Sequence, residues 1–117
     1  MGLLTNKYYI RGGGGAGARL NKYKGRYAEA EGRYPKANRN VKGTVQGYVE
    51  IARRWGLSPV ELSLGFVLRH PLVGSVIVGA TDKEQLKEVL GACNVKITDE
   101  MMAEIDEVHR KFPNPTP

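Results

Sequence analysis

The hydrophobic pattern divides the chain into two parts. Residues 8–42 show neither helical nor strand periodicity and are rich in Gly, Asn, Lys and Arg, whereas apolar residues recur at helical spacing further on. A loop of this length inside a compact domain is unusual and is typically functional or disordered. We therefore predict a glycine-rich, basic loop region at residues 1–42 and a helix–helix–strand–helix–helix segment at residues 43–117.

The first two predicted helices follow each other closely. Over residues 43–55 the apolar face comprises Val45, Tyr48, Val49 and Ala52. Gly56 is a typical residue just past a helix end. The next helix has Ser58 as N-cap, Pro59 at its first position and Glu61 completing a capping box. Pro71 ends it, and its predicted buried stripe comprises Val60, Leu64, Val67 and Leu68.

Two more helices are predicted near the end of the chain. For the third, Thr81 is the expected N-cap, Glu84 closes a second capping box and Gly91 follows the last turn. Its expected apolar face comprises Leu86, Val89 and Leu90. The last helix begins at Thr98 and is predicted to bury Met102, Ile105, Val108 and Phe112.

Between the second and third helices lies a short β-branched run, Ser75 to Val78, bounded by glycines. This pattern predicts a strand buried on both faces. A lone strand leaves backbone N–H and C=O groups unpaired, which is costly. Three explanations remain open: the chain is a piece of a larger α/β protein, it borrows strands from another chain, or the run packs irregularly or pairs with "KYYI" at residues 7–10.

The net charge of +6 is unevenly distributed. Residues 1–58 hold twelve Lys/Arg against three Glu, a net charge of +9, and residues 59–117 hold six against nine acidic residues, a net charge of −3. A basic stretch with Tyr23, Tyr27 and Tyr34 has the composition of a nucleic-acid surface. The sequence contains no recognisable nucleic-acid-binding module, so we favour a solvated loop beside a site for a small phosphorylated ligand.

Other features argue for a soluble protein of the cytoplasm. No apolar run approaches the roughly 18 to 20 residues that cross a bilayer, so we expect no membrane span. The first residues lack the pattern of a secretory signal. A single cysteine, Cys93, excludes an internal disulfide and fits a reducing compartment.

A glycine run, "IRGGGGAGARLNK" at residues 10–22, satisfies the dinucleotide-binding spacing through Gly12, Gly14 and Gly17. That motif requires a buried strand before it and an apolar helix after it. Neither is present, because "KYYI" precedes the run and "RLNKYKGRY" follows it. We interpret the run as a flexible hinge in the long loop.

The sequence "VGATDKEQ" is a better candidate for binding phosphate. Ligands of α/β proteins lie beyond the carboxyl ends of strands, where a helix N-terminus attracts anions. Gly79 and Ala80 let the backbone approach a ligand, Thr81 offers a hydroxyl, and Lys83 provides a positive charge. Gln85 and Glu88 share a helix face and are suited to an adenine edge or a ribose. The alternative is that Thr81 only caps the helix and the other three side chains are solvated surface.

Four stretches resemble the C-terminal third of an aldo-keto reductase: "GLLTNKY", "GARLNKYKGRY", "LSPVELSLGFVLRHPLVGSVIVGATDKEQLKEVL" and "ITDEMMAEIDEVHRKFPNPTP". The resemblance covers nearly the whole chain and is strongest to the soluble bacterial and plant type, near the potassium-channel β-subunit branch. It implies an α/β fold, as part of a (β/α)8 TIM barrel, with "SVIVGAT" as the eighth strand and its exit loop. It also implies NADPH as cofactor and reduction of carbonyls to alcohols.

The resemblance also implies roles for individual residues. Thr81, Lys83 and Gln85 fall where the family holds the adenosine 2′-phosphate and adenine, with Glu88 on the adenine amino group. Val89 stands where the family often has Asn, and Asn6 where it usually has Gly. The full set of cofactor-binding residues expected here is Gly2, Lys7, Arg19, Gly79, Ala80, Thr81, Lys83, Gln85 and Glu88.

The catalytic Asp, Tyr, Lys and His of such enzymes precede the matched region, so the resemblance assigns no catalytic residue to this chain, and no metal ion. His70 is expected at a helix end as a cap. We expect a truncated aldo-keto reductase that carries part of an NADP site and is inactive alone. The alternative is a non-catalytic binding module that pairs its strand with a second copy or with the missing part of a barrel.

Overall fold

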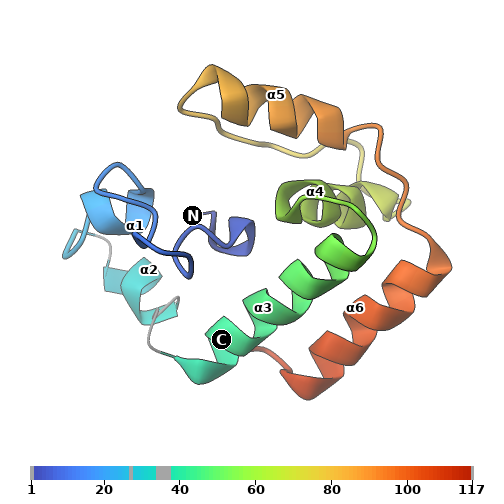
Figure 1. Ribbon diagram of the computed structural model, residues 1–117, viewed down its shortest axis with the longest axis horizontal. Helices are drawn as coiled ribbons and strands as arrows, with labels where there is room; N and C mark the ends of the chain where they lie inside the picture. The colour runs from blue at the N-terminus through green and yellow to red at the C-terminus, as the bar shows by residue number, and fades with distance from the viewer. Residues whose placement is uncertain (1, 27, 34–37, 117) are drawn as a thin grey trace.

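The computed structural model describes residues 2–26, 28–33 and 38–116. Within these ranges the chain is helical (Figure 1) and holds no β-strand. The elements are the 3-10 helix η1 (Leu3–Thr5) and helices α1 (Arg19–Lys22), α2 (Ala28–Arg33), α3 (Arg39–Arg54), α4 (Pro59–Arg69), α5 (Lys83–Ala92) and α6 (Asp99–Lys111). Two short helices thus interrupt the predicted long loop, and Tyr27 and Tyr34 lie outside the described residues.

Local capping fixes where the longer helices start. Helix α3 begins at Arg39, earlier than the predicted residue 43, because the Asn38 side chain accepts hydrogen bonds from the N–H groups of Asn40 and Val41. The predicted capping box of α4 is confirmed: the Glu61 N–H donates to Ser58 Oγ at 3.1 Å, and the Ser58 N–H donates to Glu61 Oε2 at 2.7 Å. His70 is the C-cap of α4, as expected.

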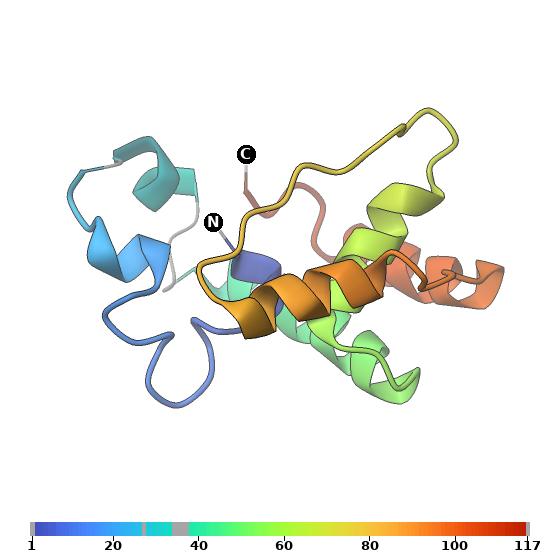
Figure 2. The ribbon, with the colours of Figure 1, turned by 90° about the horizontal axis from the view of Figure 1, so that it is seen from above.

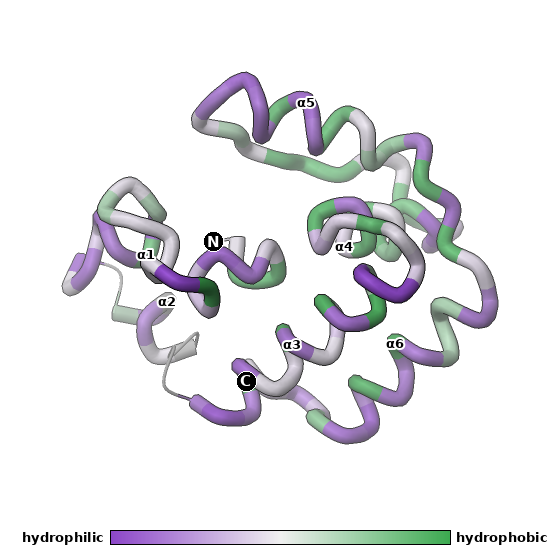
Figure 3. Tube along the Cα trace, viewed as in Figure 1, coloured by the Kyte–Doolittle hydropathy of each residue, from purple (hydrophilic) through white to green (hydrophobic). Residues whose placement is uncertain are grey.

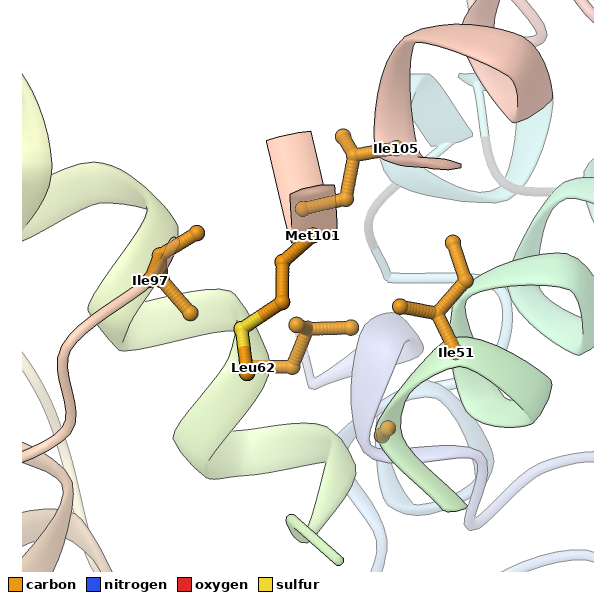
Figure 4. Close-up of a cluster of buried hydrophobic side chains, with 6 residues drawn as sticks. Ile51, Leu62, Ile97, Met101 and Ile105 are labelled. Carbon is orange, nitrogen blue, oxygen red and sulfur yellow. The ribbon is translucent and has the colours of Figure 1, made fainter. Parts of the chain in front are cut away.

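Helices α3, α4 and α6 enclose the main hydrophobic core. Helix α3 contacts both α4 and α6, and Figure 1 shows α4 lying between α3 and α5. The buried cluster drawn in Figure 4 comprises Ile51, Ala52, Leu62, Ile97, Met101 and Ile105. Met101, which the predicted stripe of α6 omitted, is more deeply buried than Met102. Thr98 caps α6 as predicted, accepting the Met101 N–H at 3.3 Å.

The prediction of which face of α4 is buried is wrong. Leu62 and Gly65 are the buried residues of this helix, whereas Val67 is 37% exposed. Gly65 faces Ile97, and a Cβ built on Gly65 would lie 3.0 Å from Ile97 Cγ1. The helix carries two apolar faces, so its periodicity alone could not choose which of them meets α6 and its preceding segment.

The predicted strand Ser75 to Val78 does not form. This segment is extended, but none of the backbone hydrogen bonds among the described residues involves residues 74–80. Ile77 is 97% exposed. Residues 7–10 form turns and give it no partner, with the Tyr9 N–H donating to Asn6 O at 2.9 Å. A strand requires a neighbour, so the one parallel-type strand of the predicted α/β fold is wrong for this structure, whose described residues are all-helical.

Helix α5 starts one residue later than predicted. Asp82, rather than Thr81, is its N-cap, and its side chain accepts the Gln85 N–H at 2.9 Å. Gly91 lies inside the last turn, because the helix continues to Ala92. Leu86 and Leu90 are 47% and 60% exposed, so most of the predicted apolar face meets solvent. Figure 3 shows that hydrophobic and hydrophilic positions alternate along α5, and that the segment before it is mainly hydrophobic.

Candidate functional site

A pocket of about 830 Å3 is lined by residues of the N-terminal loops and of the start of α5. Figure 2 shows the start of α5 and the N-terminal loops on the same side of the molecule. The wall of the pocket includes residues from three separate parts of the sequence, namely 2–7, 14–23 and 79–89, together with Val60. Eight of the nine predicted cofactor-binding residues lie in this wall: Gly2, Lys7, Arg19, Gly79, Ala80, Thr81, Gln85 and Glu88. The ninth, Lys83, is exposed in the first turn of α5 and does not line the pocket.

Lys7 is held at the wall by its immediate surroundings. Gly2 has φ +74°, which favours glycine, and a Cβ built on it would lie 2.9 Å from Lys7 Nζ, so glycine leaves free the space that this ammonium group occupies. Lys7 Nζ is also 5.5 Å from the centre of the Tyr8 ring, which attracts a cation. Asn6 adopts φ +65°, a left-handed conformation that Asn tolerates better than most residues.

The glycine run, predicted to be a flexible hinge, forms consecutive turns in the structure. Gly12 to Gly15 all have positive φ. The Asn21 side-chain N–H2 donates to Gly13 O at 2.8 Å and to Gly15 O at 2.6 Å. The Leu20 N–H donates to the buried Tyr8 hydroxyl at 3.2 Å. These bonds fix the start of α1, which places Arg19 at the pocket.

At the start of α5, three neighbouring residues form a hydrogen-bonded cluster. Both the N–H and the hydroxyl of Thr81 donate to Gln85 Oε1 at 3.1 Å. The Gln85 amide N–H2 in turn donates to Asp82 Oδ2 at 2.5 Å. The donors of Thr81 that face the pocket therefore already have an acceptor within the helix.

Sequence reasoning missed three charged or aromatic residues of this wall, Lys22, Tyr23 and Asp82. Lys22 Nζ lies 5.4 Å from the centre of the Tyr23 ring. The basic composition of this loop was visible, but it was compatible with a nucleic-acid surface as well. With Lys22 included, the wall carries the cations Lys7, Arg19 and Lys22 against the acids Asp82 and Glu88, a balance that attracts anions.

A second cavity of about 520 Å3 adjoins the pocket, sharing Gly2, Thr5, Val60, Gly79 and Val89 with it. Its lining is mainly apolar and includes Leu3, Val45, Leu64, Val78 and Tyr48 from η1, α3, α4 and the extended segment. Burial raises the pKa of the Tyr48 hydroxyl, and the nearby Asp106 carboxylate raises this pKa further. The cavity explains why residues of the α4 stripe predicted to be buried are only partly covered.

Two further findings concern other classes of site. Among the described residues, no group of three or more His, Cys, Asp or Glu side chains is placed to hold a metal ion. No helix in the described part of the chain is long and apolar enough to cross a membrane.

Comparison with known proteins identifies the class. A model of the aldo/keto reductase family matches residues 1–110. The chain therefore belongs to the aldo/keto reductase family, and the resemblance noted from its motifs is confirmed.

Individual relatives match different extents of the chain. This chain is 37% identical over 117 residues to the protein named Tas of Escherichia coli strain K12, and it is equally similar to Tas of Shigella flexneri. The match covers 100% of this chain and 32% of each Tas protein. A Schizosaccharomyces pombe protein provisionally named a voltage-gated potassium channel subunit beta is 36% identical over 61 residues, covering 50% of this chain and 18% of that protein. The chain thus spans about a third of the length of the Tas proteins.

Proposed function

We propose that this chain holds the adenosine-phosphate end of NADP(H) in an aldo/keto reductase that reduces carbonyl groups to alcohols. The observation that carries the proposal is the pocket of about 830 Å3, whose wall brings together Lys7, Arg19 and Thr81 from distant parts of the sequence. Family membership supports the oxidoreductase class. The cofactor, when bound, supplies the hydride, and the residues described here bind and orient it.

The side chains of the wall match the groups of the cofactor. Arg19 offers a planar guanidinium suited to two phosphate oxygens, and Lys7 offers a point charge. Gly79 leaves open space, because a Cβ built on it would meet nothing within 4 Å among the described residues. Glu88 accepts hydrogen bonds and Gln85 both donates and accepts, as an adenine edge requires. Val89 lies beside them and provides an apolar surface for the base.

Titration of NADP+ into the chain by isothermal calorimetry tests this proposal. Replacing Lys7 or Arg19 by alanine should weaken binding about tenfold or more, because each removes a charge-assisted contact worth about 1.5–3 kcal/mol. Lys96→Ala is the matched control, since it removes the same charge from an exposed residue outside the pocket wall and should change the dissociation constant less than about twofold. Equal losses in all three variants, or no binding to the original chain, would refute the site.

We assign no catalytic residue to this chain, because the resemblance places the catalytic Asp, Tyr, Lys and His before the matched region. The isolated chain should therefore bind cofactor without reducing an aldehyde such as 4-nitrobenzaldehyde. Consumption of NADPH with that aldehyde by the pure chain, measured as loss of cofactor absorbance, would contradict this expectation.

A second candidate function is assembly through the extended segment. Residues 74–80 have no backbone hydrogen-bond partner among the described residues, and Leu72 and Ile77 are 87% and 97% exposed. An unpaired extended segment with apolar side chains is a template for strand pairing. If two copies pair here, light scattering should show concentration-dependent association that Ile77→Asp abolishes. A chain that stays monomeric at every concentration would remove this candidate.

A further inference from the structure

Asp82 occupies a special position in the pocket. It is the N-cap of α5, and its two carboxylate oxygens accept from Gln85, one from the backbone N–H at 2.9 Å and one from the side-chain amide at 2.5 Å. It lines the pocket wall, whereas Glu84 of the same turn does not. None of the ion pairs among the described residues involves Asp82, so its negative charge is not offset by a direct salt bridge.

The hydrogen bonds of Asp82 also determine what Thr81 can offer. Asp82 holds the Gln85 amide, and the oxygen of that amide takes both the N–H and the hydroxyl of Thr81. An anion that reaches Thr81 must first displace Gln85. It must then lie close to the Asp82 carboxylate, and like charges at short range repel.

A ribose hydroxyl meets the opposite situation at the same place. The hydroxyl is neutral, and it can donate a hydrogen bond to an acidic side chain. This is how an Asp or Glu recognises the ribose 2′-hydroxyl of NAD in other dinucleotide-binding folds. The carboxylate therefore distinguishes between adenosine ligands that differ only at the 2′ oxygen.

We propose that Asp82 is a specificity-determining residue, which weakens binding of the 2′-phosphorylated cofactor NADP relative to NAD. This inference rests on the proposed function, because it assigns Asp82 a role within the same adenosine-phosphate pocket. The three cations of the wall still permit NADP to bind, and Asp82 reduces the preference they create.

Asp82→Asn removes the charge and keeps the N-cap oxygen, while its N–H2 group replaces the oxygen that accepts from the Gln85 side-chain amide. Asn is as good an N-cap as Asp, so the helix start should persist. The variant should bind NADP+ about five- to tenfold more tightly at low salt and leave NAD+ unchanged or up to about twofold weaker, as expected for removing a screened like charge. Asp82→Ser, another good N-cap without charge, should shift the ratio of the two dissociation constants in the same direction. Glu84→Gln removes the same charge outside the wall and should shift that ratio less than about twofold.

Isothermal calorimetry of both cofactors on the original chain and the three variants separates the outcomes. A selectivity shift in both Asp82 variants, absent in Glu84→Gln, supports the inference. Tight NADP+ binding with an unchanged ratio in the Asp82 variants, or an equal shift in Glu84→Gln, overturns it and leaves the proposed function standing. Failure of all four proteins to bind either cofactor overturns both.

Discussion

The bundle of α3, α4 and α6 and the segment from residue 72 to the end of α5 have similar proportions of apolar residues but differ in burial. In the bundle, Ile51 and Ile105 are 3% and 6% exposed. In the other region, Ile77 and Leu90 are 97% and 60% exposed. Both regions have well-formed helix caps, so local signals form a helix equally well in either place.

The difference shows which part of the chain contributes most to the stability of the fold. Apolar faces in the bundle meet one another, so their burial stabilises the fold without any further element. Helix α5 packs on α4 and buries Ala92, but Leu86 and Leu90 stay 47% and 60% exposed, and Ile77 of the extended segment is 97% exposed. We therefore expect the bundle to determine the free energy of unfolding, and the region around α5 to contribute little.

The largest expected effect contrasts two leucines. Leu62→Ala should destabilise the chain by about 2–5 kcal/mol, because it leaves a cavity in the bundle core. Leu90→Ala should change the free energy of unfolding by less than about 0.5 kcal/mol, as for other exposed substitutions. Urea unfolding followed by circular dichroism measures both. Comparable losses in the two variants would show that α5 is as tightly packed as the bundle.

Replacing two helical glycines by alanine should change the free energy of unfolding in opposite directions, one in each region. A Cβ on Gly47 would lie 2.9 Å from Val108 Cγ2, where α3 meets α6, whereas a Cβ on Gly91 meets nothing within 4 Å among the described residues. Gly47→Ala should destabilise by about 1–2 kcal/mol, because overpacking exceeds the gain in helix propensity. Gly91→Ala should stabilise by about 0.5 kcal/mol. The midpoint of urea unfolding reports both, and stabilisation by Gly47→Ala would contradict close packing of α3 on α6.

The smallest effect concerns the pH dependence of the bundle. Burial, and then Asp106, raise the pKa of Tyr48 above its usual value. A raised pKa in the folded state means that Tyr48 contributes stability below its unfolded pKa of about 10 and loses that contribution as pH rises through the folded pKa. The original chain should therefore lose more stability than Tyr48→Phe between about pH 9 and 11. Identical alkaline profiles in urea titrations would show that the Tyr48 hydroxyl is not buried.

The sequence predicted the helices because their signals are local. The Ser58 capping box and the Thr98 cap each depend on residues within one turn, and both formed where expected. The strand at Ser75 to Val78 depended on neighbours elsewhere, and none of the described residues supplies one. The choice of buried face on α4 also depended on tertiary packing, which periodicity does not encode.

The candidate site shows the same division. Motif resemblance identified residues that the fold then brought into one wall, from Lys7 at the N-terminus to Glu88 in α5. It missed Lys22 and Tyr23, whose place depends on how Asn21 folds the glycine run. Asp82 was overlooked because Thr81 was taken as the helix cap, and only the hydrogen bonds at the start of α5 distinguish the two.

The central claim is that the pocket at the start of α5 binds the adenosine-phosphate end of a nicotinamide cofactor. The most direct measurement is backbone amide NMR of the chain titrated with adenosine 2′,5′-bisphosphate, which contains that end alone. We expect saturable shifts at Lys7, Arg19 and the residues from Gly79 to Gln85, with the amides of Ile51 and Ile105 unmoved. Shifts confined to the bundle, or none at saturating ligand, would contradict it.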